Sequence, residues 1–307
     1  ALVSLLDDPD LNIYNQVKNQ LLELGEVCIP ILEKANFENH LDSVYKTRIS
    51  NLTHEINLNE MVTSHKKWLQ HPVNLIDGVL QIDQYFFPNI TKSYIQNQIS
   101  EIVSEISVRL HDNMDTLKKI SIINDVLYDE YKFIGDKRNY HSADNSSFGK
   151  LLQNKKGNPL SNSILYIEIA RQLNLTIMGI NLPNHFIVGF LNKDYKNLIG
   201  GKFNKEDVLF YINPFSQGVI LRKEDIQDFM QQINVIENEY YYTPCPIKHI
   251  TKRILTNLNF RTRATTSKMI IKLVEKGYIT RSLFEGDFKR YKLELTAHGR
   301  SLIEELL

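Results

Sequence analysis

The sequence predicts an α+β protein with an N-terminal helical bundle, a central unit built around an antiparallel sheet, and a small C-terminal module. Apolar residues first recur with a helical period and then change to short β-prone runs. Basic residues gather at the C-terminal end. The chain has 307 residues, of which 42% are hydrophobic and 23% charged. This composition is typical of folded globular domains and excludes a disordered or fibrous chain.

Several classes of protein are excluded by simple patterns. No apolar run approaches the ~20 residues of a membrane span, and the first residues lack the pattern of a secretory signal. Cys28 and Cys245 lie too far apart in sequence for a metal motif or a disulfide framework. We therefore expect a cytoplasmic protein with no membrane partner. No motif indicates a cofactor or a metal, and we expect neither.

The N-terminal part, residues 1–135, is expected to be helical. A turn at residues 7–10, Asp-Asp-Pro-Asp, precedes apolar residues at helical spacing, and Gly25 ends that helix. A second apolar series follows it. These two helices resemble one HEAT-type unit, and a bundle of amphipathic helices is predicted from Leu58 to Tyr131.

The central part, residues 136–245, changes its period. A predicted helix at 160–173 is followed by β-prone runs and then by a helix at 223–232. One helix followed by sequential strands with tight turns predicts an antiparallel sheet. The predicted strands cover residues 175–180, 185–190, 207–212 and 219–221.

Four motifs in this part carry a resemblance to a known family. They are Gly-Asn-Pro-Leu-Ser at 157–161, Ala-Arg-Gln-Leu at 170–173, Pro-Asn-His-Phe at 183–186 and Ile-Asn-Pro-Phe at 212–215. In this order they resemble the SirB-type bacterial branch of the transglutaminase-like superfamily, over about residues 120–222. The resemblance implies a papain-like fold in which a Cys begins the central helix, a His lies on a strand, and an Asp on the next strand orients the His.

Position by position, the resemblance places Pro159 where the Cys would be, His185 at the His and Asn213 at the Asp. Proline suits the first turn of a helix but carries no nucleophile. Asn213 could orient an imidazole by a hydrogen bond but supplies no negative charge. We therefore expect a vestigial site that is catalytically inactive and binds a protein or peptide in the central cleft.

An enzyme remains the alternative at this site. Ser161 lies two residues inside the helix and could replace the missing nucleophile, with His185 as its base. A cysteine brought close by folding could do the same. Either would make the chain a protease-like or acyl-transfer enzyme. In a third interpretation, His185 only bonds to water.

The C-terminal part, residues 246–307, differs in charge from the rest of the chain. It has 13 Lys and Arg against 6 Asp and Glu, a net charge of +7, whereas residues 1–245 carry a net −7. Such asymmetry indicates an anionic partner, most often nucleic acid, or docking of the tail on the acidic part.

The order of elements in this tail is helix, helix and β-hairpin, and residues 264–307 resemble a MarR-like winged helix. This resemblance implies an alternative function as a DNA-binding transcriptional regulator, although winged helices also dock proteins. One group of residues would face a major groove, and a second group on the wing would contact phosphates. The first group is Thr265, Thr266, Ser267, Lys268 and Lys272, and the second is Arg281, Lys289 and Arg290.

Overall fold

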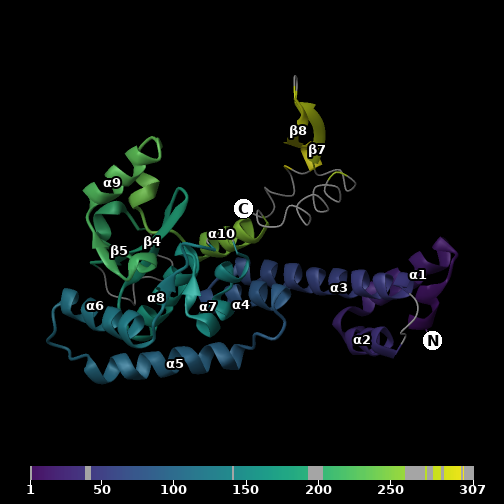
Figure 1. Cartoon of the computed structure of the whole chain (residues 1–307), viewed down its shortest axis with the longest axis horizontal. Coiled ribbons are helices and arrows are strands. Elements are labelled where there is room, and N and C mark those ends of the chain that lie inside the picture. The colour runs from purple at the N-terminus through teal and green to yellow at the C-terminus, as the bar shows by residue number, and fades with distance from the viewer. Residues whose placement is uncertain are drawn as a thin grey trace. The chain divides into compact units, whose positions relative to one another are not determined.

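A computed structural model gives the helices and strands of the chain (Figure 1). It divides into two compact units, Ala1–Pro72 with Gln81–Asn89 and Val73–Leu80 with Ile90–Leu307. The first is called unit 1 and the second unit 2. The structure describes residues 2–38, 43–139, 142–192, 203–259, 274, 279–284, 287–298 and 300.

Unit 1 is helical, as its sequence predicts. The Asp10 carboxylate accepts a hydrogen bond of 2.7 Å from the backbone N–H of Asn12 and caps α1. Gly25 ends α1 with φ +61°, a left-handed conformation that a glycine adopts without strain. The predicted helical hairpin is therefore confirmed, while its assignment as a HEAT-type unit stays a prediction. The elements are η1 (Val3–Asp7), α1 (Leu11–Leu24), η2 (Gly25–Cys28), α2 (Ile29–Glu38), α3 (Ser43–Gln70) and, shared with unit 2, α4 (Leu75–Phe86).

The core of unit 1 is formed by one side of each helix from η1 to α3. Its members recur at three- and four-residue spacings, so that each helix buries one stripe. The buried cluster contains Leu6, Val17, Leu21, Cys28, Leu32, Tyr45, Ile49, Leu52 and Ile56.

Unit 2 begins with further helices that cover its core. Thr91 caps α5 (Lys92–Arg109) and Asp115 caps α6 (Thr116–Asn124), each by accepting a hydrogen bond from a backbone N–H three residues later. A turn of π-helix, η3 (Asp125–Glu130), extends α6. The helical period predicted for α5 is confirmed by its buried residues Ile95, Ile99, Ile102 and Ile106.

The sheet of unit 2 has four antiparallel strands in the order β3-β4-β5-β6. Asn184 takes a left-handed φ of 56° in the tight turn between β3 and β4. The predicted antiparallel sheet and the helix that follows it are confirmed. Their bounds are β3 (Ile177–Leu182), β4 (His185–Leu191), β5 (Val208–Asn213), β6 (Val219–Leu221) and α9 (Lys223–Gln232).

The central helix α8 (Pro159–Gln172) packs on this sheet. It contacts β3 and β4, and also α5 and α7 (Phe148–Asn154). Every residue of α8 from Pro159 to Ala170 is buried, because neighbours cover the helix on more than one face. The Ser163 hydroxyl donates to the Phe186 carbonyl at 3.3 Å. A short parallel pair, β1 (Ile134–Gly135) and β2 (Lys156–Gly157), precedes α8.

Asn124, at the end of α6, connects three parts of unit 2. Its Oδ1 accepts from the Tyr166 hydroxyl of α8 at 2.9 Å, and its Nδ2 donates to the Gly218 carbonyl at 3.1 Å. Gly218 has φ +71°, and a Cβ there would clash with the Asn124 side chain. The helix α6 is thus fixed both to α8 and to the loop between β5 and β6.

Two further elements follow the sheet. The predicted helix is confirmed as α10 (Ile247–Asn259), which contacts β3. The predicted hairpin is confirmed as β7 (Ile279–Phe284) and β8 (Asp287–Leu295), paired antiparallel. The helix predicted between them lies outside the described residues, apart from Val274. The winged helix therefore stays a prediction.

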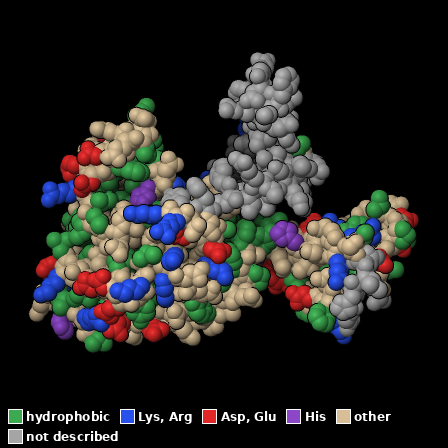
Figure 2. Space-filling model, viewed as in Figure 1, with side chains coloured by type: hydrophobic (Ala, Val, Ile, Leu, Met, Phe, Trp, Pro, Cys, Tyr) green, Lys and Arg blue, Asp and Glu red, His purple; other side chains and the backbone are tan. Residues whose placement is uncertain are grey.

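The surface carries charges of both signs. Figure 2 shows basic and acidic side chains interspersed over the viewed face of the described residues. None of the described helices combines the length and the apolar character that crossing a membrane requires.

Candidate functional site

The start of α8 is closed by a reciprocal cap. Asn158 Oδ1 accepts from the Ser161 N–H at 2.9 Å, and Ser161 Oγ accepts from the Asn158 N–H at 3.0 Å. Pro159 occupies the first helical position, where a missing N–H costs no hydrogen bond. The Asn158 amide also donates to Ser146 Oγ at 2.9 Å. Pro159, which the resemblance places at the nucleophile position, is therefore the first residue of a helix whose start is capped by side-chain hydrogen bonds.

The Ser161 hydroxyl is used within this cap. It donates to the Asn145 carbonyl at 2.7 Å, and the side chain is 1% exposed. A Cβ at Gly157 would clash with Ser161 Oγ, so the glycine permits the close approach. Among the described residues, Ser161 makes no hydrogen bond to His185. The serine and the imidazole are not brought together as a nucleophile and its base.

His185 and Asn213 are brought together. His185 begins β4, Asn213 ends the neighbouring strand β5, and His185 Nε2 lies 3.3 Å from Asn213 Oδ1. The Ser216 N–H donates to the same oxygen at 3.3 Å. Because an amide oxygen only accepts, Nε2 must carry the proton of this hydrogen bond. The Nδ1 atom then presents a lone pair.

The surroundings of His185 favour a neutral ring. Burial is the main cause that lowers its pKa, and the charge of Arg253 lowers it further, whereas the hydrogen bond with Asn213 raises it. Two phenylalanine rings flank the half-buried imidazole, with centroids 6.0 Å away for Phe215 and 5.8 Å for Phe229. The site therefore offers a neutral hydrogen-bonding group between aromatic walls.

Arg253 was not singled out by the sequence. It lies on α10, and its Nη1 donates to Asn181 Oδ1 at 2.9 Å and to the Leu182 carbonyl at 3.3 Å. Leu182 is the strand partner of His185, so Arg253 holds the turn that begins the His185 strand. The signal in the sequence was a pair of basic residues at 252–253, within the helical period of α10.

The two cysteines lie in separate cores. Cys28 belongs to unit 1, where its Sγ donates to the Gly25 carbonyl at 3.1 Å and burial raises its pKa. Burial raises the pKa of Cys245 to about 12, so this thiol is protonated at neutral pH. In the part of the chain that the structure describes, neither sulfur hydrogen-bonds to His185.

The stretch of sequence that contains His185 and Asn213 matches a known family. The family model described as the transglutaminase-like superfamily matches residues 93–256. The chain belongs to the transglutaminase-like superfamily. The matched stretch runs from α5 to α10 and includes both residues of the pair as well as Arg253. The domain boundaries predicted at 135/136 and 245/246 fall inside it and stay predictions.

Individual relatives come from mammals and bacteria. The chain is 26% identical over 266 residues to F-box only protein 21 of Mus musculus, and the same figures hold for that of Homo sapiens. The match covers 76% of this chain and 39% of each relative, so the chain spans about two fifths of their length. It is 24% identical over 189 residues to a UPF0162 protein of Xylella fastidiosa, covering 60% of both. No solved structure matches the chain.

These relatives define how far the assignment of this transglutaminase-like chain goes. The family model over residues 93–256 establishes the superfamily, whereas the SirB-type branch stays a prediction. Within the described residues, no group of three or more His, Cys, Asp and Glu side chains is placed to hold a metal ion.

The residues predicted to contact DNA are described only in part. Arg281 lies on β7, and Lys289 and Arg290 lie on β8. The remaining five, Thr265, Thr266, Ser267, Lys268 and Lys272, lie outside the described residues.

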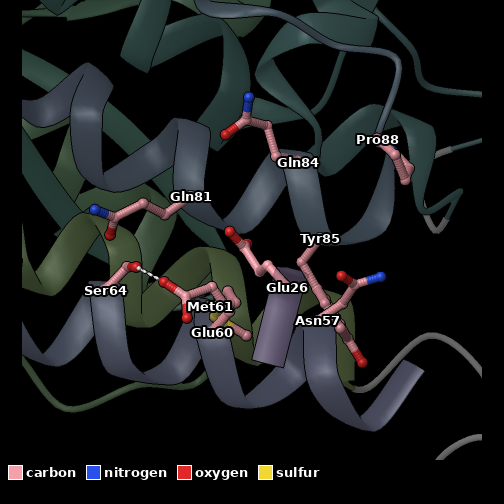
Figure 3. A pocket seen from close by; sticks show the side chains of 9 residues that line it. All are labelled: Glu26, Asn57, Glu60, Met61, Ser64, Gln81, Gln84, Tyr85 and Pro88. Atoms are coloured by element: carbon pink, nitrogen blue, oxygen red, sulfur yellow. Dashed lines mark hydrogen bonds between the residues drawn. The ribbon is translucent and has the colours of Figure 1, made fainter. Parts of the chain in front are cut away.

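Unit 1 contains a separate polar pocket of about 200 Å³ (Figure 3). Side chains of α3 and α4 line its opposite sides, and the Ser64 hydroxyl donates to Glu60 Oε1 at 3.1 Å. Carboxylate and amide oxygens here can accept hydrogen bonds. The lining residues are Glu26, Asn57, Glu60, Met61, Ser64, Gln81, Gln84, Tyr85 and Pro88.

Proposed function

We propose that the transglutaminase-like region is a non-catalytic module that binds a protein or peptide segment around His185. One observation carries the proposal. The position that the resemblance assigns to the nucleophile holds Pro159, which begins α8 inside a closed cap. Proline has no group that could attack a carbonyl. His185 and Asn213 keep the arrangement of a base and its orienting residue without a nucleophile to activate.

The surroundings of His185 support a binding role. Ligand sites in proteins are mostly apolar, with a few polar groups that fix the ligand's orientation. Phe215 and Phe229 supply the apolar walls, and His185 Nδ1 supplies an acceptor for a donor such as a peptide N–H.

The enzyme alternative needs a rearranged site. A catalytic Ser161 would have to give up its hydrogen bond to the Asn145 carbonyl and reach His185, which would open the cap of α8. A catalytic cysteine would have to leave a core where burial raises its pKa. The first step opens the start of α8, and the second removes a thiol from a buried core.

The absence of catalysis is tested with covalent probes on the full chain. A fluorophosphonate is used for serine and iodoacetamide for cysteine, and the wild type is compared with His185→Ala. We expect equal labelling of the two proteins. Labelling of the wild type that disappears in His185→Ala contradicts the proposal and establishes an enzyme.

A Pro159→Cys variant is the positive control for the assigned position. A thiol at the first position of α8 would lie at the positive end of the helix dipole, which lowers a thiol pKa. We expect iodoacetamide to modify the introduced thiol faster than the two native cysteines at neutral pH. A slow reaction at this position shows that it is not equivalent to a nucleophile site.

Binding is tested by selecting peptides from a phage-displayed library on the full chain. Enriched peptides should bind His185→Ala at least about tenfold more weakly, which is about 1.4 kcal/mol. The matched control is His71→Ala, an exposed histidine of unit 1. Peptides that bind His185→Ala as well as the wild type would contradict a site at this ring.

We also propose duplex DNA binding by the tail as a second function, supported by the hairpin β7–β8 and the net charge of +7. Binding should weaken steeply with salt, because phosphate contacts release counterions. It should be lost in Lys268→Ala/Lys272→Ala and retained in Lys118→Ala/Lys119→Ala on α6. A wild type that binds no duplex at low salt removes this function.

A further inference from the structure

The described part of unit 2 contains a basic pocket of about 280 Å³ beside α10. It lies between this helix, the end of β3 and the short helix η8 (Glu239–Tyr242). None of its lining residues is acidic. They are Asn181, Tyr240, His249, Lys252, Arg253 and Thr256.

Two permanent positive charges face this pocket. The Lys252 side chain is exposed, and its ammonium group makes no ion pair or hydrogen bond with a described residue. Arg253 is held in place by its hydrogen bonds to Asn181 and to the Leu182 carbonyl. A fixed guanidinium loses less side-chain freedom when it binds an anion.

Neutral polar groups complete the wall. His249 Nδ1 lies 3.2 Å from the Tyr240 hydroxyl, and the Asn181 amide lies 3.4 Å from the same oxygen. Burial is the main cause that lowers the pKa of His249, and Lys248 and Lys252 lower it further. A nearby anion would offset those lysine charges, so the His249 ring can report an anion in the pocket.

We infer that this pocket binds a carboxylate of an acidic peptide segment. One fixed cation, one exposed cation and neutral hydrogen-bonding groups in a concave pocket suit one Asp or Glu side chain or a chain terminus. A nucleic acid would be bound more favourably by a row of cations matched to successive phosphates.

The pocket adjoins the proposed peptide site. Arg253 lines the pocket, holds the turn that precedes His185, and lowers the His185 pKa by its charge. Asn181 and His185 lie on opposite faces of the β3–β4 hairpin, so a ligand that contacts both places must pass around its turn. The inference rests on the proposed function and specifies it, because the segment bound at His185 would carry an acidic residue on its α10 side.

The test uses acetyl-tetraglutamate amide as the probe, with the tetraglutamine peptide as its uncharged counterpart. Binding to the full chain at low salt is followed by NMR of the His249 ring. We expect tetraglutamate to shift the His249 signals and tetraglutamine to leave them in place. No shift with tetraglutamate overturns the inference.

The decisive variants remove one charge each from α10. Lys252→Gln should weaken tetraglutamate binding about fivefold, which is the size expected for one partly exposed ion pair. Lys248→Gln is the matched control, since Lys248 is exposed one turn earlier and does not line the pocket. Equal weakening in both variants would indicate general attraction to a basic helix and overturn the inference. Circular dichroism checks that both variants fold.

Two further outcomes distinguish this inference from the proposed peptide site at His185 and from nucleic-acid binding. Tetraglutamate binding that persists in His185→Ala, together with selected peptides that bind this variant as tightly as the wild type, supports the pocket and contradicts the proposed function alone. A short DNA duplex that shifts the His249 signals at lower concentration than tetraglutamate assigns the pocket to nucleic acid and overturns the inference.

Discussion

The imidazole of His185 is oriented by a carboxamide. Asn213 accepts from Nε2 and from the Ser216 N–H, which fixes the ring's tautomer but adds no negative charge. Burial and the charge of Arg253 both disfavour the imidazolium. A histidine that takes a proton from a nucleophile becomes charged, and a neighbouring carboxylate stabilises that charge. A histidine that only accepts a hydrogen bond stays neutral and does not need the carboxylate.

Asn213→Asp tests this electrostatic account. A carboxylate in place of the amide favours the charged imidazole, so the pKa of His185 should rise above that of the wild type. An NMR titration of the His185 ring protons measures the change. A pKa that stays the same or falls in Asn213→Asp would show that the ring does not sense the charge of residue 213.

At the scale of one element, α8 depends on its first turn. Asn158 caps the helix and also donates to Ser146, and both residues are buried. Removing the Asn158 side chain would leave the Ser161 N–H without its side-chain acceptor and would remove the hydrogen bond to Ser146 Oγ. A buried polar group without a partner costs more than an exposed one.

Asn158→Ala should therefore destabilise unit 2 by about 2 kcal/mol, the upper end of the range for helix caps. The matched control is Asp115→Ala at the exposed cap of α6, for which about 1 kcal/mol is expected. Urea unfolding followed by circular dichroism compares the two midpoints. A larger loss in Asp115→Ala would contradict the role given to the α8 cap.

Periodicity and turn residues were enough to predict the elements. The isoleucines of α5 and the four strands follow local patterns that a reader of the sequence can count. Contacts between distant residues were not predictable in this way. Ser161 looked like a possible nucleophile because its acceptor, Asn145, lies 16 residues upstream. Arg253 was given no role because its partner Asn181 is 72 residues away and meets it only in the folded chain.

At the scale of the whole molecule, three described histidines have a pKa that is lowered by burial. Burial is the main cause that lowers the pKa values of His65 in unit 1 and of His185 and His249 in unit 2. The unfolded chain, in which these rings have ordinary pKa values, therefore binds more protons than the folded chain as the pH falls through that range.

We expect the free energy of unfolding to fall as the pH is lowered from neutral to about 5, because protonation then favours the unfolded chain. Urea midpoints across this range measure the effect. Replacing His65, His185 and His249 together by Gln should reduce the slope. A wild type whose stability is constant or increases over this range would contradict the expectation.

The contacts of Asn124 have a practical consequence for anyone who shortens this protein. A fragment that starts after α6 would keep the sheet and α8 but would strand the hydroxyl of Tyr166 and the carbonyl of Gly218, which Asn124 now satisfies. Helix α6 is therefore an integral part of the fold that holds α8 and the sheet. The smallest piece that folds by itself should begin ahead of α5, near residue 90.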